Sequence, residues 1–132
     1  MISLTTKEWE ITKNFIFDVM NKDGRINFDW MDFEGFAREC TPSVMVKVDE
    51  ALSIRHQSVI AVDEVKKNLH GTLKGLLVAV FYKEDETIAM DELKGLQEVL
   101  SDLPAELDVT WGVLQSEDLK NSRGVAMIAF EK

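Results

Sequence analysis

The stretch Leu76-Leu77-Val78-Ala79-Val80-Phe81-Tyr82 decides the fold class of this 132-residue chain. Seven apolar residues in a row are typical of a strand that is covered on both faces, because a half-exposed strand would alternate with polar residues. Gly75 precedes the run and the charged residues 83–86 follow it as a turn. We therefore expect a central buried strand over residues 75–82.

Further strands flank this central one in the sequence. Val44, Val46 and Val48 alternate with other residues and predict a strand over 43–49. Two more strands are expected over 107–115 and 123–131. The polar connection between these last two is short enough to predict a hairpin-like link between antiparallel neighbours.

Helical spacing of apolar residues separates the strands. A helix over 53–69 is predicted to turn four residues inward, namely Val59, Val62, Val65 and Leu69. A second helix is expected over 90–103, from the spacing of Leu93, Leu96, Leu100 and Leu103, and Pro104 ends it.

The N-terminal part reads as two more helices. Residues 6–21 show helical periodicity that ends near Gly24, and a shorter helix runs from about residue 30 to Cys40. The predicted order is α-α-β-α-β-α-β-β. It indicates one α/β (α+β) domain over 1–132, a two-layer sandwich with a four-stranded mixed sheet. We divide it into a leading helix (1–24), an acidic loop with a short helix (25–40), and the sheet with its two helices (43–131).

Composition excludes several function classes. The net charge of −9 argues against nucleic acid as a partner, since that needs clustered lysines and arginines. No apolar run reaches the roughly 18 residues of a membrane span. The N-terminus lacks the features of a signal peptide, and Cys40 is the single cysteine, so we expect a cytoplasmic protein.

Asn27, Asp29 and Asp32 group at the entry of the second helix. A structural role is available to them, with Asp29 as an N-cap and Asp32 near the positive end of the helix dipole. A calcium loop competes for the neighbouring residues, since Asn21, Asp23 and Gly24 fit EF-hand positions. Val19 and Trp30 then occupy two essential ligand positions, so we expect no calcium site.

The pattern N-x-D-x-x-D at Asn27, Asp29 and Asp32 resembles the synergy loop of the FtsZ/tubulin family of polymerising GTPases. The likeness extends over residues 9–131. The segments that carry it are Gly75-Leu76-Leu77-Val78, Ile88-Ala89-Met90-Asp91-Glu92-Leu93, Val109-Thr110-Trp111-Gly112-Val113-Leu114 with Glu117-Asp118-Leu119-Lys120, and Val125-Ala126-Met127-Ile128-Ala129. The order of elements is similar to the second, C-terminal domain of that family.

The resemblance implies a non-catalytic domain for protein interaction or assembly in bacterial cell division. Its acidic loop would contact a GTPase partner of the FtsZ type and contribute to that partner's GTP hydrolysis, or the domain would self-associate. The family's glycine-rich phosphate loop has no counterpart here, because the seven glycines are scattered singly. We therefore expect no enzyme activity of the chain alone, no GTP binding and no cofactor.

Other hypotheses remain open beside this one. The chain could be a small-molecule-binding or oligomeric enzyme-like α/β sandwich with no role in cell division, or a fragment or decayed gene product. We expect no metal at His56 and His70, a buried structural thiol at Cys40, and no hydrolase triad. The serines considered for such a triad are Ser53, Ser58 and Ser116.

Overall fold

The computed structural model describes residues 2–5, 24–26, 40–69, 71–117 and 119–131. The elements in these ranges are β1 (Ile2–Thr5), β2 (Gly24–Ile26), β3 (Thr41–Val48), α3 (Ile54–Asn68), β4 (Leu73–Tyr82), α4 (Met90–Ser101), β5 (Asp108–Gln115) and β6 (Arg123–Glu131). The four strands and two helices predicted from residue 43 onward are confirmed, with ends within two residues of the prediction. The helices predicted before Thr41 lie outside the described residues, except for Cys40.

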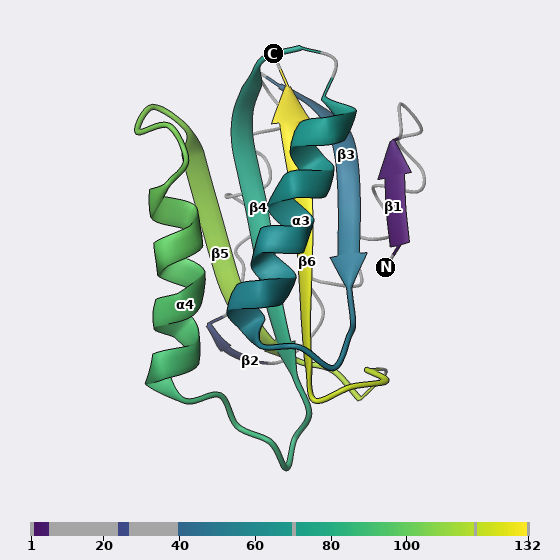
Figure 1. Cartoon of the computed structure of the whole chain (residues 1–132), viewed down its shortest axis with the longest axis vertical. Helices are drawn as coiled ribbons and strands as arrows, with labels where there is room; N and C mark the ends of the chain where they lie inside the picture. The colour runs from purple at the N-terminus through teal and green to yellow at the C-terminus, as the bar shows by residue number, and fades with distance from the viewer. Residues whose placement is uncertain (1, 6–23, 27–39, 70, 118, 132) are drawn as a thin grey trace.

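The strands form one mixed sheet in the order β1-β3-β6-β4-β5-β2 (Figure 1). β6 runs antiparallel to both β3 and β4, whereas β5 runs parallel to β4. It follows that β3, β4 and β5 all point the same way and that their carboxyl ends meet at one edge of the sheet. We call this edge, with the connections that leave and enter it, the carboxyl edge.

The predicted hairpin between β5 and β6 is wrong, because β4 lies between these two strands. The β4–α4–β5 crossover places β5 parallel to β4, so β6 pairs with the opposite edge of β4. Neighbouring strands are only about 4.8 Å apart, so the connection over 116–122 is long enough to pass the end of β4. The Ser116 N–H donates to the Tyr82 carbonyl at 2.8 Å as the chain crosses.

Two short strands were not predicted, and they extend the sheet on both sides. β1 pairs antiparallel with β3, with Ile2 opposite Lys47. β2 pairs antiparallel with β5, and its register shifts between Gly24 and Ile26. Segments of four and three residues are too short to show a periodicity, so only their pairing identifies them as strands.

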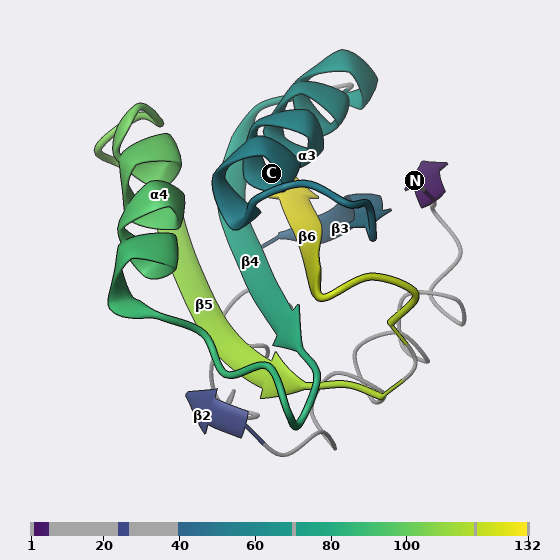
Figure 2. The same ribbon diagram turned by 60° about the horizontal axis from the view of Figure 1, so that its bottom comes forward.

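Both helices pack on the same face of the sheet (Figures 1 and 2). They cover a core that includes Leu76, Val78, Val80 and Tyr82 on β4. The intervening Ala79 and Phe81 belong to a second buried cluster with Leu114, Leu119 and Ala126. The central strand is therefore buried on both faces, as its continuous apolar run predicts.

The predicted inward face of α3 needs one correction. Val62 and Val65 are buried, but Val59 is 41% exposed. The buried positions instead include Ile54, Gln57, Ser58 and Ala61, so the apolar stripe is rotated and takes in two polar residues. Helical periodicity alone did not distinguish the two stripes because valines occur on both.

Candidate functional site

The acidic residues Asn27, Asp29 and Asp32 lie outside the described residues. The structure does describe what precedes them: β2 ends at Ile26, at the outer edge of the sheet beside β5. The calcium-loop residues Asn21 and Asp23 also fall outside the described ranges.

The remaining sequence candidates have structural positions. Ser53 caps α3 by accepting the His56 N–H at 3.2 Å, and its hydroxyl lies 3.0 Å from His56 Nδ1. The buried Ser58 hydroxyl donates to the Ile54 carbonyl at 2.7 Å, and Ser116 is buried in the crossing. The Cys40 thiol is free and half-buried rather than fully buried. His70 is outside the described ranges.

In the described ranges no three His, Cys, Asp or Glu side chains gather where they could hold a metal ion. No helix there is long and apolar enough to cross a membrane.

A cavity of about 490 Å³ opens at the carboxyl edge. Three connections surround it, because β6 begins between the ends of β3 and β4. Its lining residues are Glu50, Ala51, Leu52 and Ser53 after β3, Lys83 and Glu86 after β4, and Lys120, Asn121, Ser122 and Arg123 before and at the start of β6. The carboxyl ends of strands in open α/β sheets are common sites of ligand binding.

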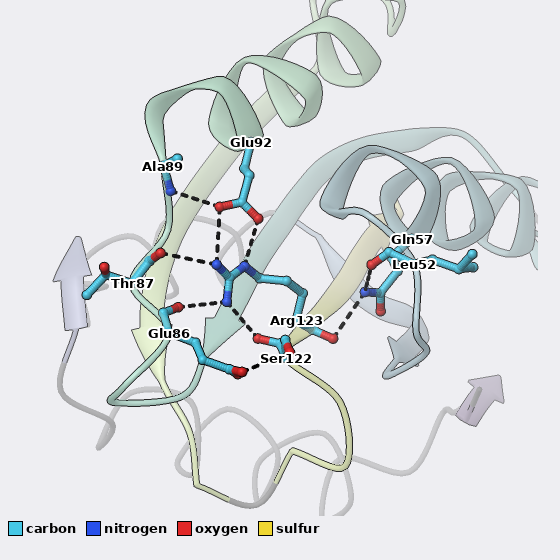
Figure 3. A network of polar contacts seen from close by, with 8 residues as sticks. All are labelled: Leu52, Gln57, Glu86, Thr87, Ala89, Glu92, Ser122 and Arg123. Atoms are coloured by element: carbon cyan, nitrogen blue, oxygen red, sulfur yellow. Dashed lines mark hydrogen bonds and ion pairs between the residues drawn. The ribbon is translucent and has the colours of Figure 1, made fainter.

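Arg123 is the centre of the polar contacts at this edge (Figure 3). Its Nε and Nη2 donate to the two carboxylate oxygens of Glu92, at 2.8 and 3.2 Å. The other donations go to backbone carbonyls, namely Glu86 at 2.7 Å, Ser122 at 2.8 Å and Thr87 at 3.1 Å. A guanidinium has five N–H donors, so all of them are used within the chain. Arg123 thereby holds the β4–α4 connection against the start of β6.

Gln57 makes the corresponding connection for α3. Its side chain is fully buried, and Nε2 donates to the carbonyls of Leu52 at 2.8 Å and Arg123 at 3.1 Å. Its Oε1 accepts the Glu50 N–H at 3.2 Å. One buried amide therefore joins the β3–α3 connection to the first residue of β6 (Figure 3).

Asp49 anchors the β5–β6 connection from the end of β3. Its carboxylate accepts the backbone N–H groups of Lys120 at 2.7 Å and Asn121 at 3.0 Å. Partial burial would raise the pKa of Asp49, but the hydrogen bonds from Lys120 and Asn121 outweigh it and lower the pKa below its ordinary value. The pKa of Glu92 is lowered mainly by its hydrogen bonds from Arg123.

Because of these two carboxylates, we expect the fold to lose stability in acid. Because both pKa values are lower in the folded than in the unfolded chain, their stabilisation is complete above the unfolded values, 3.8 for Asp49 and 4.5 for Glu92. It is lost as the pH falls through the folded values. We expect the free energy of unfolding, measured with urea, to fall below about pH 4.5. Glu92→Gln should flatten this decline, whereas Glu106→Gln, which removes an exposed acidic charge, should leave it as in the wild type.

Arg123, Gln57 and Asp49 were not predicted as site residues from the sequence. Gln57 did carry a signal, since a polar residue lies in the stripe formed by Ile54, Ala61 and Val65. Arg123 and Asp49 carried none, because a charged residue at a strand end is ordinary. Only the arrangement of the strands brings their partners to them.

Comparison with known proteins rests on structure alone. No protein-family model matches the chain, and no curated protein matches it by sequence. The W319Y mutant of FtsZ from M. jannaschii matches with a TM-score of 0.64 over 91% of this chain, at 19% sequence identity. A thiamine monophosphate kinase from Aquifex aeolicus matches over 92% of this chain, with a TM-score of 0.49 and 11% identity.

The chain spans 38% of the length of the FtsZ chain and 40% of that of the kinase. At such low identity the likeness to FtsZ concerns the fold. The FtsZ-like fold predicted from the sequence is confirmed.

Proposed function

We propose that this chain is a non-catalytic protein-interaction or assembly domain, which docks on a polymerising GTPase of the FtsZ type or on a second copy of itself. The observation that carries the proposal is the FtsZ-like fold over 91% of the chain. In the family that the sequence resembles, the loop with Asn27, Asp29 and Asp32 contacts the next subunit. In this chain those residues directly follow β2, an outer strand of the sheet.

The polar groups of the carboxyl edge support a non-catalytic role. All five donors of Arg123 and both carboxylate oxygens of Asp49 are engaged in holding connections together. A catalytic acid, base or electrostatic stabiliser needs capacity left for substrate. Arg123 has no donor left for a substrate, because all five hold the loops in position.

The double substitution Asp29→Ala and Asp32→Ala tests the docking role. We expect it to change GTP turnover by an FtsZ-type GTPase titrated with the chain, because a carboxylate can orient the attacking water. The free energy of unfolding should fall by no more than about 1 kcal/mol, the cost of a lost helix cap. Phosphate release and urea unfolding measure the two effects.

The matched control is Glu84→Ala with Asp85→Ala, which removes the same charge from the exposed turn after β4. It should leave GTP turnover as it is with the wild-type chain. Equal effects of both double variants, or turnover that never responds to the chain, would contradict docking through the acidic loop.

The carboxyl-edge cavity favours a second candidate, a small-molecule-binding α/β sandwich. At about 490 Å³ it lies within the size range of ligand pockets, and most of its lining residues are polar or charged. Saturable binding of a metabolite that shifts the NMR signals of Ser53, Lys83 and Lys120 would support this candidate over the interaction domain.

A further inference from the structure

The two helices diverge along their length and leave a groove between them. Near their N-terminal halves they touch, since a Cβ on Gly95 would lie 2.9 Å from Arg55 Cβ. Both views show α3 and α4 farther apart toward their C-terminal ends (Figures 1 and 2). A groove of about 380 Å³ lies between residues 55–66 of α3 and residues 98–103 at and just after the C-terminal end of α4. We call it the α3–α4 groove.

The floor of the α3–α4 groove is apolar. It is formed by Val59 and Val62 of α3 and by Val99 and Leu103 at the C-terminal end of α4. Val62 and Leu103 are nearly buried, whereas Val59 is 41% exposed and stands at the mouth. Val59 is one of three large apolar side chains that are exposed in the described ranges, and the other two, Leu52 and Met90, lie at the carboxyl edge.

The rim of the groove carries an unfavourable arrangement of charge. Glu98 lies in the last turn of α4 and Asp102 is its C-cap, where the helix dipole and the free carbonyls favour cations. The last turn of α4 has no basic residue, whereas that of α3 has Lys66 and Lys67. Across the groove, Arg55 contacts Glu98 at 3.6 Å in a pair that is more than 60% exposed on both sides, and Lys66 and Asp63 complete the rim.

We propose that the α3–α4 groove binds a segment of a partner protein in which an apolar side chain stands next to a lysine or arginine. An apolar side chain of the partner would cover Val59 and fill the floor, and a lysine or arginine next to it would reach Asp102 and the carbonyl end of α4. The anchor of the partner supplies buried apolar area, and its cation lies at the end of a helix whose own last turn and C-cap have acidic residues and no basic one. Acidic residues at the C-terminal end of α4 go against the usual charge preference of helix ends, and such departures are expected at functional surfaces.

This inference deepens the proposed function by naming a second contact surface, and it rests on the chain being an interaction domain. The groove is formed by α3 and α4, whereas the acidic residues follow β2. Asp29→Ala with Asp32→Ala should therefore leave groove binding unchanged. A failure of groove binding and a failure of the acidic-loop test are thus distinguishable.

The test is an NMR titration of the ¹⁵N-labelled chain at about 0.15 M salt, where charges beyond about 8 Å are screened. The probe is a synthetic helical peptide with leucines on one face and lysines on the other, and glutamates replace the lysines in the control peptide. We expect saturable shifts at Val59, Val62 and Val99 with the lysine peptide alone. Val59→Gln should weaken its binding about tenfold, the equivalent of losing one good apolar contact.

Asp102→Asn separates the electrostatic part of the proposal. It should weaken lysine-peptide binding while raising the melting temperature of the free chain, because it removes a carboxylate from the negative end of α4. Gln97→Ala, on the exposed face of α4 outside the groove, should change neither quantity. Three results would each overturn the proposal. They are NMR shifts spread over the whole acidic surface, equal binding of both peptides, and binding that Val59→Gln does not weaken. Val59 is exposed, so its variant should fold normally.

Discussion

Replacing Gln57 with leucine is expected to lower the free energy of unfolding by about 3 kcal/mol, although leucine is more apolar and similar in size. The reason is that the fully buried Gln57 amide binds two backbone carbonyls, those of Leu52 and Arg123, and accepts the Glu50 N–H. Leucine would take this donor away from two carbonyls whose hydrogen bonds are part-buried. Each buried polar group that loses its partner costs about 1–3 kcal/mol.

The matched control is Gln97→Leu. Gln97 also lies on a helix but is exposed, so the change should stay within about 0.5 kcal/mol. Urea unfolding of both variants measures the difference. If Gln57→Leu costs no more than Gln97→Leu, the buried amide does not hold the carboxyl edge together.

Replacing Arg123 with alanine is expected to cost about 2–4 kcal/mol of unfolding free energy. Five hydrogen bonds would be lost. Of the three described hydrogen bonds that the Glu92 carboxylate accepts, only the one from the Ala89 N–H, at 2.8 Å, would remain. The side chains of Arg123 and Glu92 are only 13% and 31% exposed, so water replaces the lost bonds poorly. Arg123→Lys should recover little, because an ammonium cannot reproduce the planar fork.

Arg55→Ala is the corresponding control, since it removes an ion pair in which both partners are mostly exposed. Its expected cost is about 0–1 kcal/mol. A double-mutant cycle of Arg123→Ala with Glu92→Ala, followed by urea unfolding, isolates the pair itself. A coupling energy near zero would show that the backbone contacts of Arg123, rather than Glu92, carry its effect.

The long strands could be predicted one by one from the sequence, but their order in the sheet could not. The apolar run of β4 and the alternation in β3 are local patterns, so both strands were predicted with ends within two residues of those observed. The place of β6 between β3 and β4 is not local, because it depends on which edge of β4 the β4–α4–β5 crossover leaves free. β1 and β2 can be recognised as strands only from their pairing with β3 and β5.

The candidate sites divide in the same way. Asn27, Asp29 and Asp32 are close in sequence, so a pattern could identify them. Four of the five hydrogen bonds of Arg123 join residues 31 or more positions apart, and the contacts of Gln57 and Asp49 span up to 72 positions. No spacing in the chain marks such contacts, since they form only after three strands end at one edge.

By itself the sequence determined the strands and helices of the described core, its apolar content and the resemblance to the FtsZ fold. The strands and helices follow from side-chain periodicity, which acts within one or two turns of chain, whereas the resemblance rests on the quoted segments and their order along the chain. Only the tertiary structure decided the strand order, the partners of Arg123 and Gln57, and the exposure of Val59 in the α3–α4 groove. Those features depend on how elements distant in the sequence approach one another, and that approach is set by the packing of the whole domain.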